Sequence, residues 1–242
     1  GDTVIIQKAG DVIPDVLRVL KNLRPKHSKP YVFPKKCPAC GSSVVRHSGE
    51  VAHYCSSKNC FAREREKLYH FVSKKAFDIE HLGPKIIDQL LDAHLIASPA
   101  DIFLLQFGDL EPLERFEEKS AQNLIASIEK SKHISFSRFI FALGIRHVGE
   151  ETAILLANYF RSLDHLKKAS LGAINALFDV GEVMAKSVYD FFQDPKNLIM
   201  IQALLHAGVK IQMPSRIKNR LHGKTFVLTG GLQALTRDEA KE

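Results

Sequence analysis

The hydrophobic and polar positions of the chain follow a repeating pattern between Ile79 and Val188. The pattern is centred on four dipeptides whose second residues lie 34, 32 and 32 positions apart: Leu82-Gly83, Phe116-Glu117, Val148-Gly149 and Val180-Gly181. Apolar residues stand four positions before each second residue, and apolar or small residues stand four and seven positions after it. A fixed period of this length indicates a repeated supersecondary unit, and we number the copies repeats 1 to 4 along the chain.

Each repeat predicts two helices joined by a tight turn. The apolar residue four positions before the second residue of the dipeptide is expected to end the first helix, at Ile79, Leu113, Ile145 and Leu177. Glycine suits the turn because it takes positive φ without penalty. The residues at +4 and +7 have the spacing of a buried helical stripe. They are Ile87 and Leu90, Ala121 and Leu124, Ala153 and Leu156, and Ala185 and Val188.

The turns of the repeats have the features of an anion-binding site. Each leaves unpaired backbone N–H groups at a helix N-terminus, where the helix dipole favours negative charge. Such a site suits a phosphate. The pattern resembles the helix-hairpin-helix motif, which binds the DNA backbone without reading sequence. The alternative is an all-α repeat whose turns only connect helices, but four copies in register in a basic chain favour DNA binding.

The repeats differ in how well they suit a phosphate. Repeat 3 is the strongest candidate, because Gly144 and Gly149 bracket its turn and Arg146 lies inside it. Repeat 1 follows, with Gly83 and Lys85.

The other two repeats are weaker candidates. Repeat 4 has Gly181 and Lys186, but Asp179 would repel phosphate. Repeat 2 has Glu117 in place of glycine, so its turn is expected to be wider or strained and mainly structural. Lys119 either reaches a phosphate or is solvated.

Composition agrees with a polyanionic partner. The chain of 242 residues is 45% hydrophobic and 25% charged, as in ordinary globular proteins. Its 34 basic minus 27 acidic residues leave a net charge of +7. No apolar run reaches the ~18–20 residues needed to span a bilayer, and the residues at the start do not resemble a secretory signal. We therefore expect a nucleic-acid partner and no membrane.

The cysteines form two close pairs separated by 14 residues, in the pattern C-x2-C and C-x4-C. They are Cys37, Cys40, Cys55 and Cys60, and the chain has no others. The spacing predicts tetrahedral thiolate ligation of Zn²⁺, which would supply the folding energy of a segment with almost no core. Two disulfides or four structural thiols are the alternatives, although nothing indicates the oxidising compartment that disulfides need. His47 and His53 could replace a cysteine but are expected to be exposed.

The segments flanking these parts have β-strand or mixed patterns. Residues 1–33 contain two or three strands, too few to close a sheet alone, and suggest the end of a β-barrel. Residues 34–66 hold the cysteines and 67–213 the repeats. Within 214–242, a buried strand at Gly223–Gly230 precedes a capping box that opens a helix at Thr236. The predicted fold is therefore mainly α, between a barrel end and the start of an α/β domain.

These stretches together resemble the bacterial NAD⁺-dependent DNA ligases. The motifs that carry the resemblance are Gly1–Pro14 for the end of an OB-fold, Cys37-Pro-x-Cys-Gly-Ser42 with Cys55 and Cys60 for the zinc finger, His70–Ser73, Asp78-Ile79, Lys119–Asn123 and Leu143–Glu150 for the four-hairpin domain, and Gly223–Gly230 with Thr236-Arg237 for a BRCT domain. Phe61 and Arg63 stand where Pro and Gln are common, and Glu117 replaces the usual glycine.

The resemblance implies nick sealing in duplex DNA during replication and repair, with NAD⁺ and Mg²⁺ used by the whole enzyme. The family's adenylation motif, Lys-x-Asp-Gly, does not occur in this chain. The chain is therefore expected to lack catalytic residues, to be inactive alone, and to clamp nicked DNA for an upstream adenylation domain of the same polypeptide. The resemblance also implies a monomer in the bacterial cytoplasm, at the nucleoid. The alternatives are a free-standing helix-hairpin-helix adaptor of a repair complex and an all-α scaffold.

Overall fold

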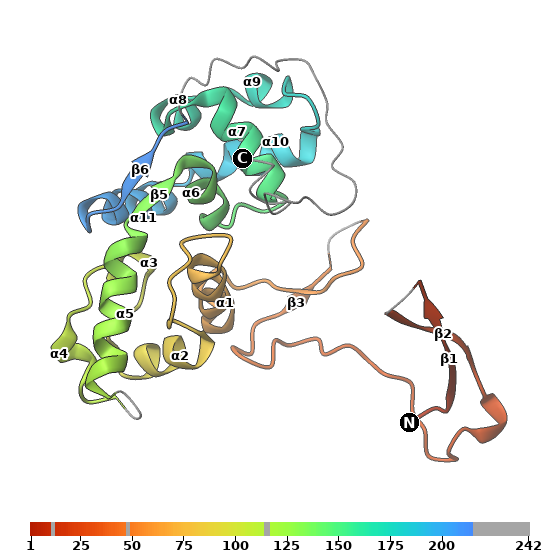
Figure 1. Cartoon of the computed structure of the whole chain (residues 1–242). Helices are drawn as coiled ribbons and strands as arrows, with labels where there is room; N and C mark the ends of the chain where they lie inside the picture. The colour runs from red at the N-terminus through yellow and green to blue at the C-terminus, as the bar shows by residue number, and fades with distance from the viewer. Residues whose placement is uncertain (11–12, 47–48, 114–116, 215–242) are drawn as a thin grey trace, which may run out of the picture. The chain divides into compact units, whose positions relative to one another are not determined.

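The computed structural model describes residues 1–10, 13–46, 49–113 and 117–214 (Figure 1). The chain divides into two compact units, Gly1–Glu66 and Lys67–Glu242, which we call the amino-terminal unit and the helical unit. The strand predicted at Gly223–Gly230 and the helix predicted to start at Thr236 lie outside the described residues. Among those described, no helix is long and apolar enough to cross a membrane.

The amino-terminal unit begins with a two-stranded antiparallel sheet, as the β-type pattern predicted. β1 (Val4–Ala9) pairs with β2 (Ile13–Val19), and a short 3-10 helix, η1 (Lys21–Leu23), follows. Every residue of β2 is exposed, including Ile13 at 69% and Val16 at 55%. A two-stranded sheet is at best marginally stable by itself, and burial of these apolar side chains contributes little to its stability here.

A second small sheet in this unit lies among the cysteines. β3 (Val44–Val45) pairs with β4 (Tyr54–Cys55) in antiparallel register, with Val44 opposite Cys55. The sheet lies between the first cysteine pair and Cys60, and Cys55 belongs to its second strand.

The helical unit consists mainly of short helices (Figure 1). They are α1 (Phe61–Val72), whose first residues belong to the amino-terminal unit, α2 (Pro84–Asp92), α3 (Pro99–Ile102), α4 (Phe107–Leu110), α5 (Glu118–Ser131), α6 (Phe136–Ala142), α7 (Glu150–Phe160), α8 (Leu163–Lys167), α9 (Leu171–Asn175), α10 (Glu182–Gln193) and α11 (Pro195–His206). The first helices of the four repeats are α1, α4, α6 and α9, and the second helices are α2, α5, α7 and α10.

The repeat stripe forms the core of this unit, as predicted. All eight residues at +4 and +7 are at most 1% exposed. A cluster of aromatic rings joins them: Phe77 lies 4.3 Å from Phe71, 5.1 Å from Phe103 and 6.3 Å from Phe139, between ring centroids. Because Phe139 belongs to repeat 3 and the other three to the first part of the unit, the rings pack the two parts together.

The first helices end earlier than the pattern predicted. α1 ends at Val72, before Ile79, and α6 ends at Ala142, before Ile145. Ile79 and Ile145 are nevertheless only 4% exposed each. These two side chains therefore bury the connection that follows each first helix, and they do not belong to the last turn of the helix.

A parallel strand pair links two distant points of the helical unit. β5 (His133–Ser135) lies beside β6 (Lys210–Gln212), and Ile134 is opposite Ile211. The pair joins the start of repeat 3 to the segment after α11. Repeats 3 and 4 are thus enclosed between two paired strands.

Candidate metal centre and nucleic-acid interface

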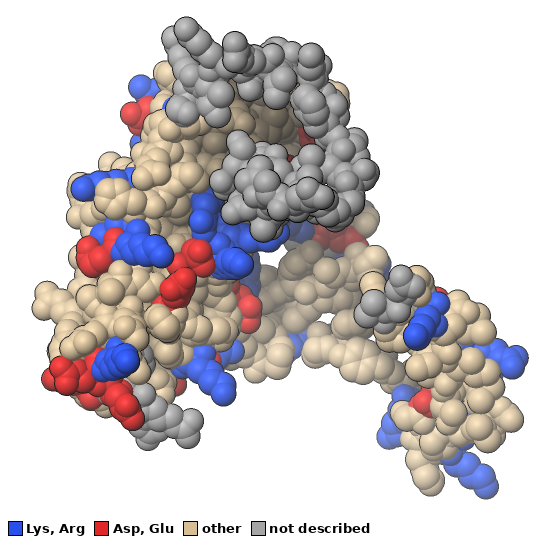
Figure 2. Space-filling model, viewed as in Figure 1, with Lys and Arg blue, Asp and Glu red and all other residues tan. Residues whose placement is uncertain are grey.

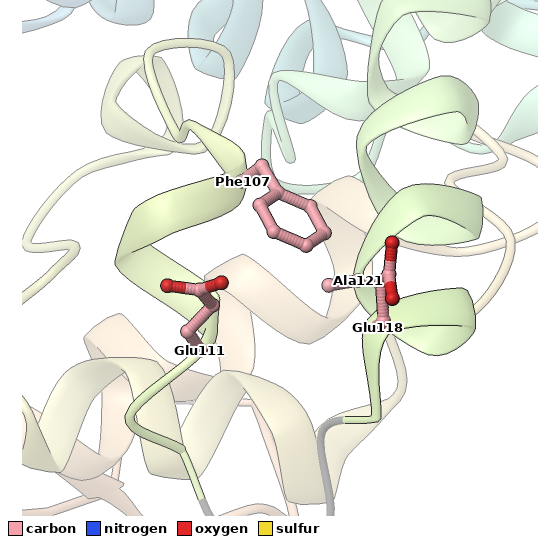
Figure 3. Close-up of a pocket in the computed structure, with 4 residues that line it drawn as sticks. All are labelled: Phe107, Glu111, Glu118 and Ala121. Carbon is pink, nitrogen blue, oxygen red and sulfur yellow. The ribbon is translucent and has the colours of Figure 1, made fainter.

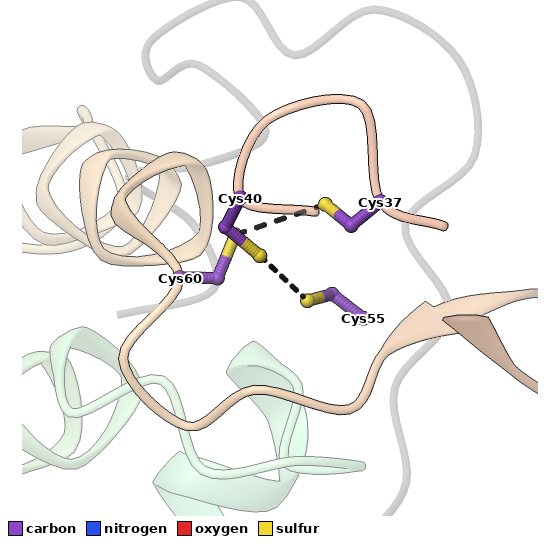
Figure 4. Close-up of side chains that lie close together, drawn as sticks. All are labelled: Cys37, Cys40, Cys55 and Cys60. Carbon is purple, nitrogen blue, oxygen red and sulfur yellow. Dashed lines mark hydrogen bonds between the residues drawn. The ribbon is translucent and has the colours of Figure 1, made fainter. Parts of the chain in front are cut away.

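The four cysteines converge on one point (Figure 4). Their sulfur atoms all lie within 4.8 Å of one another, with Sγ–Sγ distances of 4.0 Å for Cys37–Cys60 and 3.4 Å for Cys40–Cys55. A tetrahedral site with Zn–S bonds of ~2.3 Å requires Sγ–Sγ separations of roughly 3.8 Å. A disulfide would need ~2.05 Å, so the arrangement fits a zinc ion and excludes the disulfide alternative.

The first cysteine pair lies in a tight loop closed by backbone hydrogen bonds. Gly41 N donates to Cys37 O at 2.8 Å, and Cys37 N donates to Ser42 O at 2.7 Å. Gly41 has a φ of 72°, a conformation that glycine takes without steric cost. The loop thereby turns both sulfur atoms to the same side.

The second pair is organised by the start of α1. Cys60 is 1% exposed, and its carbonyl accepts hydrogen bonds from the backbone N–H groups of Arg63 and Glu64. Arg63 Nη1 donates to Cys55 O at 3.2 Å and to Ser57 O at 3.0 Å. Arg63, which the resemblance marks only as a departure, thus holds the C-x4-C loop closed.

Two of the thiols have pKa values that are shifted in opposite directions. Hydrogen bonds from the side chain and backbone of Ser42 lower the pKa of Cys40 to about 6. The backbone N–H of Ser57 lowers the pKa of Cys55, but burial and the neighbouring cysteines outweigh it and raise that pKa to about 12. A bound Zn²⁺ would offset the negative charge of thiolates gathered at this point. His53, the predicted alternative ligand, instead stacks on Phe33 at 4.1 Å between ring centroids, and His47 lies outside the described residues.

The turns of repeats 1, 3 and 4 share one backbone conformation. The N–H before the glycine donates to the carbonyl three residues earlier: Leu82 to Ile79 at 3.3 Å, Val148 to Ile145 at 3.1 Å, and Val180 to Leu177 at 3.2 Å. The third residue of each four-residue turn has positive φ, as in a type II turn. These residues are His81 at 66°, His147 at 67° and Asp179 at 65°.

The expectation that the turn glycines take positive φ is wrong. Gly83, Gly149 and Gly181 are helix N-caps with φ between −79° and −88° and extended ψ, which any residue adopts. The positive φ falls two residues earlier. At each of the three glycines, an added Cβ would meet no atom within 4 Å. Neither conformation nor internal packing therefore requires glycine, and its absent side chain leaves the backbone open to a ligand.

Glu117 in repeat 2 has the same N-cap conformation, with φ −77° and ψ 155°. The predicted strain at this residue is therefore absent, although residues 114–116 of the turn lie outside the described residues. A hollow of roughly 510 Å³ beside this helix start is lined by Phe107, Glu111, Glu118 and Ala121 (Figure 3). The two carboxylates line the same hollow, so repeat 2 carries negative charge beside its helix start.

The helix starts of the helical unit fall into two groups. α6, α8, α9 and α11 begin with a Ser or Asp side chain that accepts a hydrogen bond from a backbone N–H of the first turn. In α3 and α4, an aspartate of the first turn accepts from the N-cap N–H. The second helices of the repeats, α2, α5, α7 and α10, have no side-chain cap. The first N–H groups of these helices therefore lack the side-chain partner that helix starts usually have. Ile86 N and Ser120 N instead donate to the N-cap carbonyls, and Pro84, the first residue of α2, has no N–H to offer.

The charged residues predicted to contact DNA lie at or just after these turns. Lys85 and Lys119 are exposed in the first turns of α2 and α5, and Arg146 is exposed in the turn of repeat 3. Lys186 pairs with Asp190 at 2.8 Å, which offsets its charge. Figure 2 shows basic side chains interspersed with acidic ones on the helical unit. On the face that Figure 2 shows, the helical unit is therefore not uniformly basic.

Gly144 has a different reason to be glycine from the glycines at the N-caps. Its φ is 64°, and a Cβ there would lie 3.5 Å from His70 Cδ2. His70 Nε2 lies 2.8 Å from Phe141 O, near the end of α6. At 3.5 Å a Cβ would be in ordinary contact with His70, so the positive φ is what favours glycine at this position.

Sequence reasoning missed the contacts that hold repeats 1 and 3 together. Arg138 of α6 donates to carbonyls in the connection between the two helices of repeat 1, and Lys75 of that connection pairs with Glu150 at 2.7 Å. These partners are more than 60 residues apart in the chain, so no local pattern could have revealed them.

The comparisons with known proteins agree with this geometry. The family model of the NAD-dependent DNA ligase C4 zinc finger domain matches residues 36–62, which include all four cysteines. A model of the helix-hairpin-helix motif matches residues 138–201, which include repeats 3 and 4. A DNA ligase of Desulfosudis oleivorans is 46% identical over 248 residues, which cover 100% of this chain and 36% of that protein. The chain thus spans about a third of the length of this curated relative. Over its own whole length it is similar to part of a DNA ligase, and its cysteine segment matches the zinc finger of the NAD-dependent enzymes.

Proposed function

We propose that this chain is the DNA-clamping part of an NAD⁺-dependent DNA ligase that joins a 5′-phosphate to a 3′-hydroxyl at nicks in duplex DNA. The observation that carries the proposal is the pair of features shared by Gly83, Gly149 and Gly181: an uncapped helix start and open space where a side chain would stand. A backbone phosphate fits both, because its oxygens accept from the exposed N–H groups and its bulk needs the space.

Binding of this kind does not depend on base sequence. Backbone N–H groups at helix starts contact phosphate oxygens, which carry no direct sequence information. Repeat 3 is the proposed main site, with Gly149 and Arg146. Its first-turn Glu150 is paired with Lys75, which reduces the local repulsion of a phosphate.

The remaining repeats rank below repeat 3. Charge at the helix starts alone does not set this order, because the first turn of α7 also carries Glu151; Arg146 in its turn is the reason repeat 3 is placed first. Repeat 1 combines Gly83 with Lys85 and has no acidic residue in the first turn of its second helix. Repeat 4 has Glu182 in that turn, besides Asp179. We propose that repeat 2 acts mainly through packing, because Glu117 and Glu118 stand at its helix start.

The proposal assigns a role to each part of the chain. Residues 1–33 are the last strands of an OB-fold, whose other strands would cover the exposed apolar side chains of β1 and β2. Residues 34–66 form the zinc finger, 67–213 the DNA-binding domain, and 214–242 a linker and the start of a BRCT domain.

The catalytic steps of the whole enzyme are proposed to lie elsewhere in it. Adenylation by NAD⁺ and sealing with Mg²⁺ would use an upstream adenylation domain, so this chain alone is expected to be inactive. We further propose that it acts as a monomer in the bacterial cytoplasm, at the nucleoid.

Binding of nicked and of intact duplexes at two salt concentrations tests the clamp. We expect binding at low salt that weakens steeply at high salt, because phosphate contacts release counterions. Duplexes of unrelated sequence should compete equally. Absence of binding at low salt, or binding indifferent to salt, would exclude the clamp and favour a structural scaffold. NAD⁺-dependent sealing by the isolated chain would contradict its proposed inactivity.

A further inference from the structure

Repeats 1 and 3 share features that repeat 4 lacks. In both, a residue five positions before the N-cap glycine also has positive φ: Asp78 at 53° and Gly144 at 64°. The matching residue of repeat 4, Ala176, has φ −74°. In repeats 1 and 3, two residues with positive φ therefore precede the N-cap glycine, at five and two positions before it.

Arg138 connects these two repeats directly. Its side chain extends from α6, the first helix of repeat 3, to the connection between the two helices of repeat 1. Nε donates to Ala76 O at 2.9 Å and Nη2 donates to Lys74 O at 2.6 Å. Nη2 also lies 3.6 Å from the carboxylate of Asp78, the first of the two residues with positive φ in repeat 1. The guanidinium is thus engaged by the protein's own carbonyls, in the planar two-donor geometry that arginine provides.

Two further contacts join the same segments. His70, at the end of α1, reaches Phe141 O at the end of α6. Lys75, in the connection that Arg138 binds, pairs with Glu150 in the first turn of α7. Together these contacts run from the segment before the turn of repeat 1 to both sides of the turn of repeat 3.

We propose that Arg138 is a positioning residue for DNA binding, which fixes the separation of the repeat 1 and repeat 3 turns so that both engage phosphates of one duplex. The inference rests on the proposed clamp function. A rigid pair of weak sites binds more tightly than two loosely connected ones, because the second contact forms at high effective concentration and little ordering remains to be done. Arg138 itself contacts no phosphate in this arrangement.

The test compares Arg138→Gln and Arg138→Lys with the wild-type chain in binding to a nicked duplex over a range of salt. The charge-matched control is Lys130→Gln, at an exposed position in the last turn of α5. We expect Arg138→Gln to weaken binding about tenfold while the slope of log K against log salt is unchanged, because the same phosphates are contacted once bound. Arg138→Lys keeps the charge but not the planar pair of donors. Its affinity for the duplex should therefore lie between those of the wild-type chain and Arg138→Gln. Lys130→Gln should lose less than Arg138→Gln.

Two outcomes would overturn the inference. A slope smaller in magnitude by about 0.9 in Arg138→Gln would mean that Arg138 contacts a phosphate itself. Wild-type affinity with a lowered melting temperature would mean that Arg138 only stabilises the fold. Circular dichroism identifies a variant that fails to fold. If Arg138→Gln does not fold, the DNA affinity and the salt slope of Arg138→Lys test the inference in its place. If the wild-type chain does not bind DNA, the proposed function itself fails.

Discussion

Arg63 supports the metal centre without being a ligand. Its guanidinium bonds the carbonyls of Cys55 and Ser57, and its own N–H bonds the carbonyl of Cys60. These contacts shape the loop that carries two of the four thiols. Partners of metal ligands commonly affect metal affinity almost as strongly as the ligands themselves.

We therefore predict that Arg63→Ala lowers zinc affinity by about 10- to 100-fold. The loop between Cys55 and Cys60 would lose both side-chain hydrogen bonds, so the thiolates would have to be ordered by the metal alone. Competition with a coloured chelator measures the change. Lys58→Ala, at an exposed position of the same loop, is the control and should bind zinc as the wild-type chain does. Equal affinities of the two variants would show that the loop needs no support from Arg63.

Gly149 allows a test that separates DNA binding from stability. Its extended φ suits alanine, and a Cβ there meets no protein atom within 4 Å. Gly149→Ala should therefore change the free energy of unfolding by at most about 1 kcal/mol. The added methyl group stands where the phosphate is proposed to approach, so the affinity for a nicked duplex should fall by roughly tenfold.

The control for Gly149→Ala is Gly108→Ala in α4, where a Cβ also meets nothing within 4 Å. That change lies away from the N-cap glycines and should leave DNA binding unaffected. Unaltered binding by Gly149→Ala would be evidence against a phosphate at this helix start.

At the scale of the element, the four second helices differ in one respect that decides their proposed roles. All begin with an N-cap residue in the same extended conformation and without a side-chain cap. Only in repeat 2 does that residue carry a side chain, and this chain is acidic. The backbone at Glu117 therefore has the conformation of the other three N-caps, but a carboxylate side chain stands where the glycines leave open space.

Glu117→Gly is accordingly predicted to strengthen DNA binding by a few-fold and to increase the magnitude of the salt slope by about 0.9, because one more phosphate is bound. Glu117→Gln removes the charge but keeps the side chain, so it separates repulsion from blockage. It should strengthen binding less than the glycine variant. Identical effects of the two would show that charge alone closes the site, and no effect of either would leave repeat 2 a packing element.

At the scale of the whole molecule, the two units are stabilised by different means. The helical unit has a continuous apolar core that includes Phe77, Phe139 and Leu156. In the amino-terminal unit, Cys60 is the one buried apolar residue among those described, and β2 is exposed throughout. The zinc ion is therefore expected to supply most of the folding free energy around the cysteines.

Removal of zinc with a strong chelator should unfold the cysteine module and leave the helices largely intact. Most of the far-ultraviolet circular dichroism signal at 222 nm should remain, while residues 37–60 become sensitive to proteolysis, because local regions unfold according to their own stability. Addition of Zn²⁺ should restore protection. A collapse of the whole helical signal on chelation would mean that the core of the helical unit depends on the metal.

The sequence by itself determined the features that depend on local periodicity. The stripe at +4 and +7 predicted the core residues of all four repeats, because helical spacing decides which side chains share a face. The cysteine spacing predicted the metal centre, because two short loops on a hairpin bring four thiols together with few alternatives. The order of strands, cysteines and helices also followed from the sequence.

Only the tertiary structure decided where the backbone bends and which distant segments hold each other. The positive φ falls on His81, His147 and Asp179 and not on the glycines that follow, because it depends on how the connection must turn to reach the next helix. The contact of Arg138 with Lys74 and Ala76 spans more than 60 residues. Such a contact exists only once the aromatic core has packed repeats 1 and 3 together, and no local pattern of residue types encodes it.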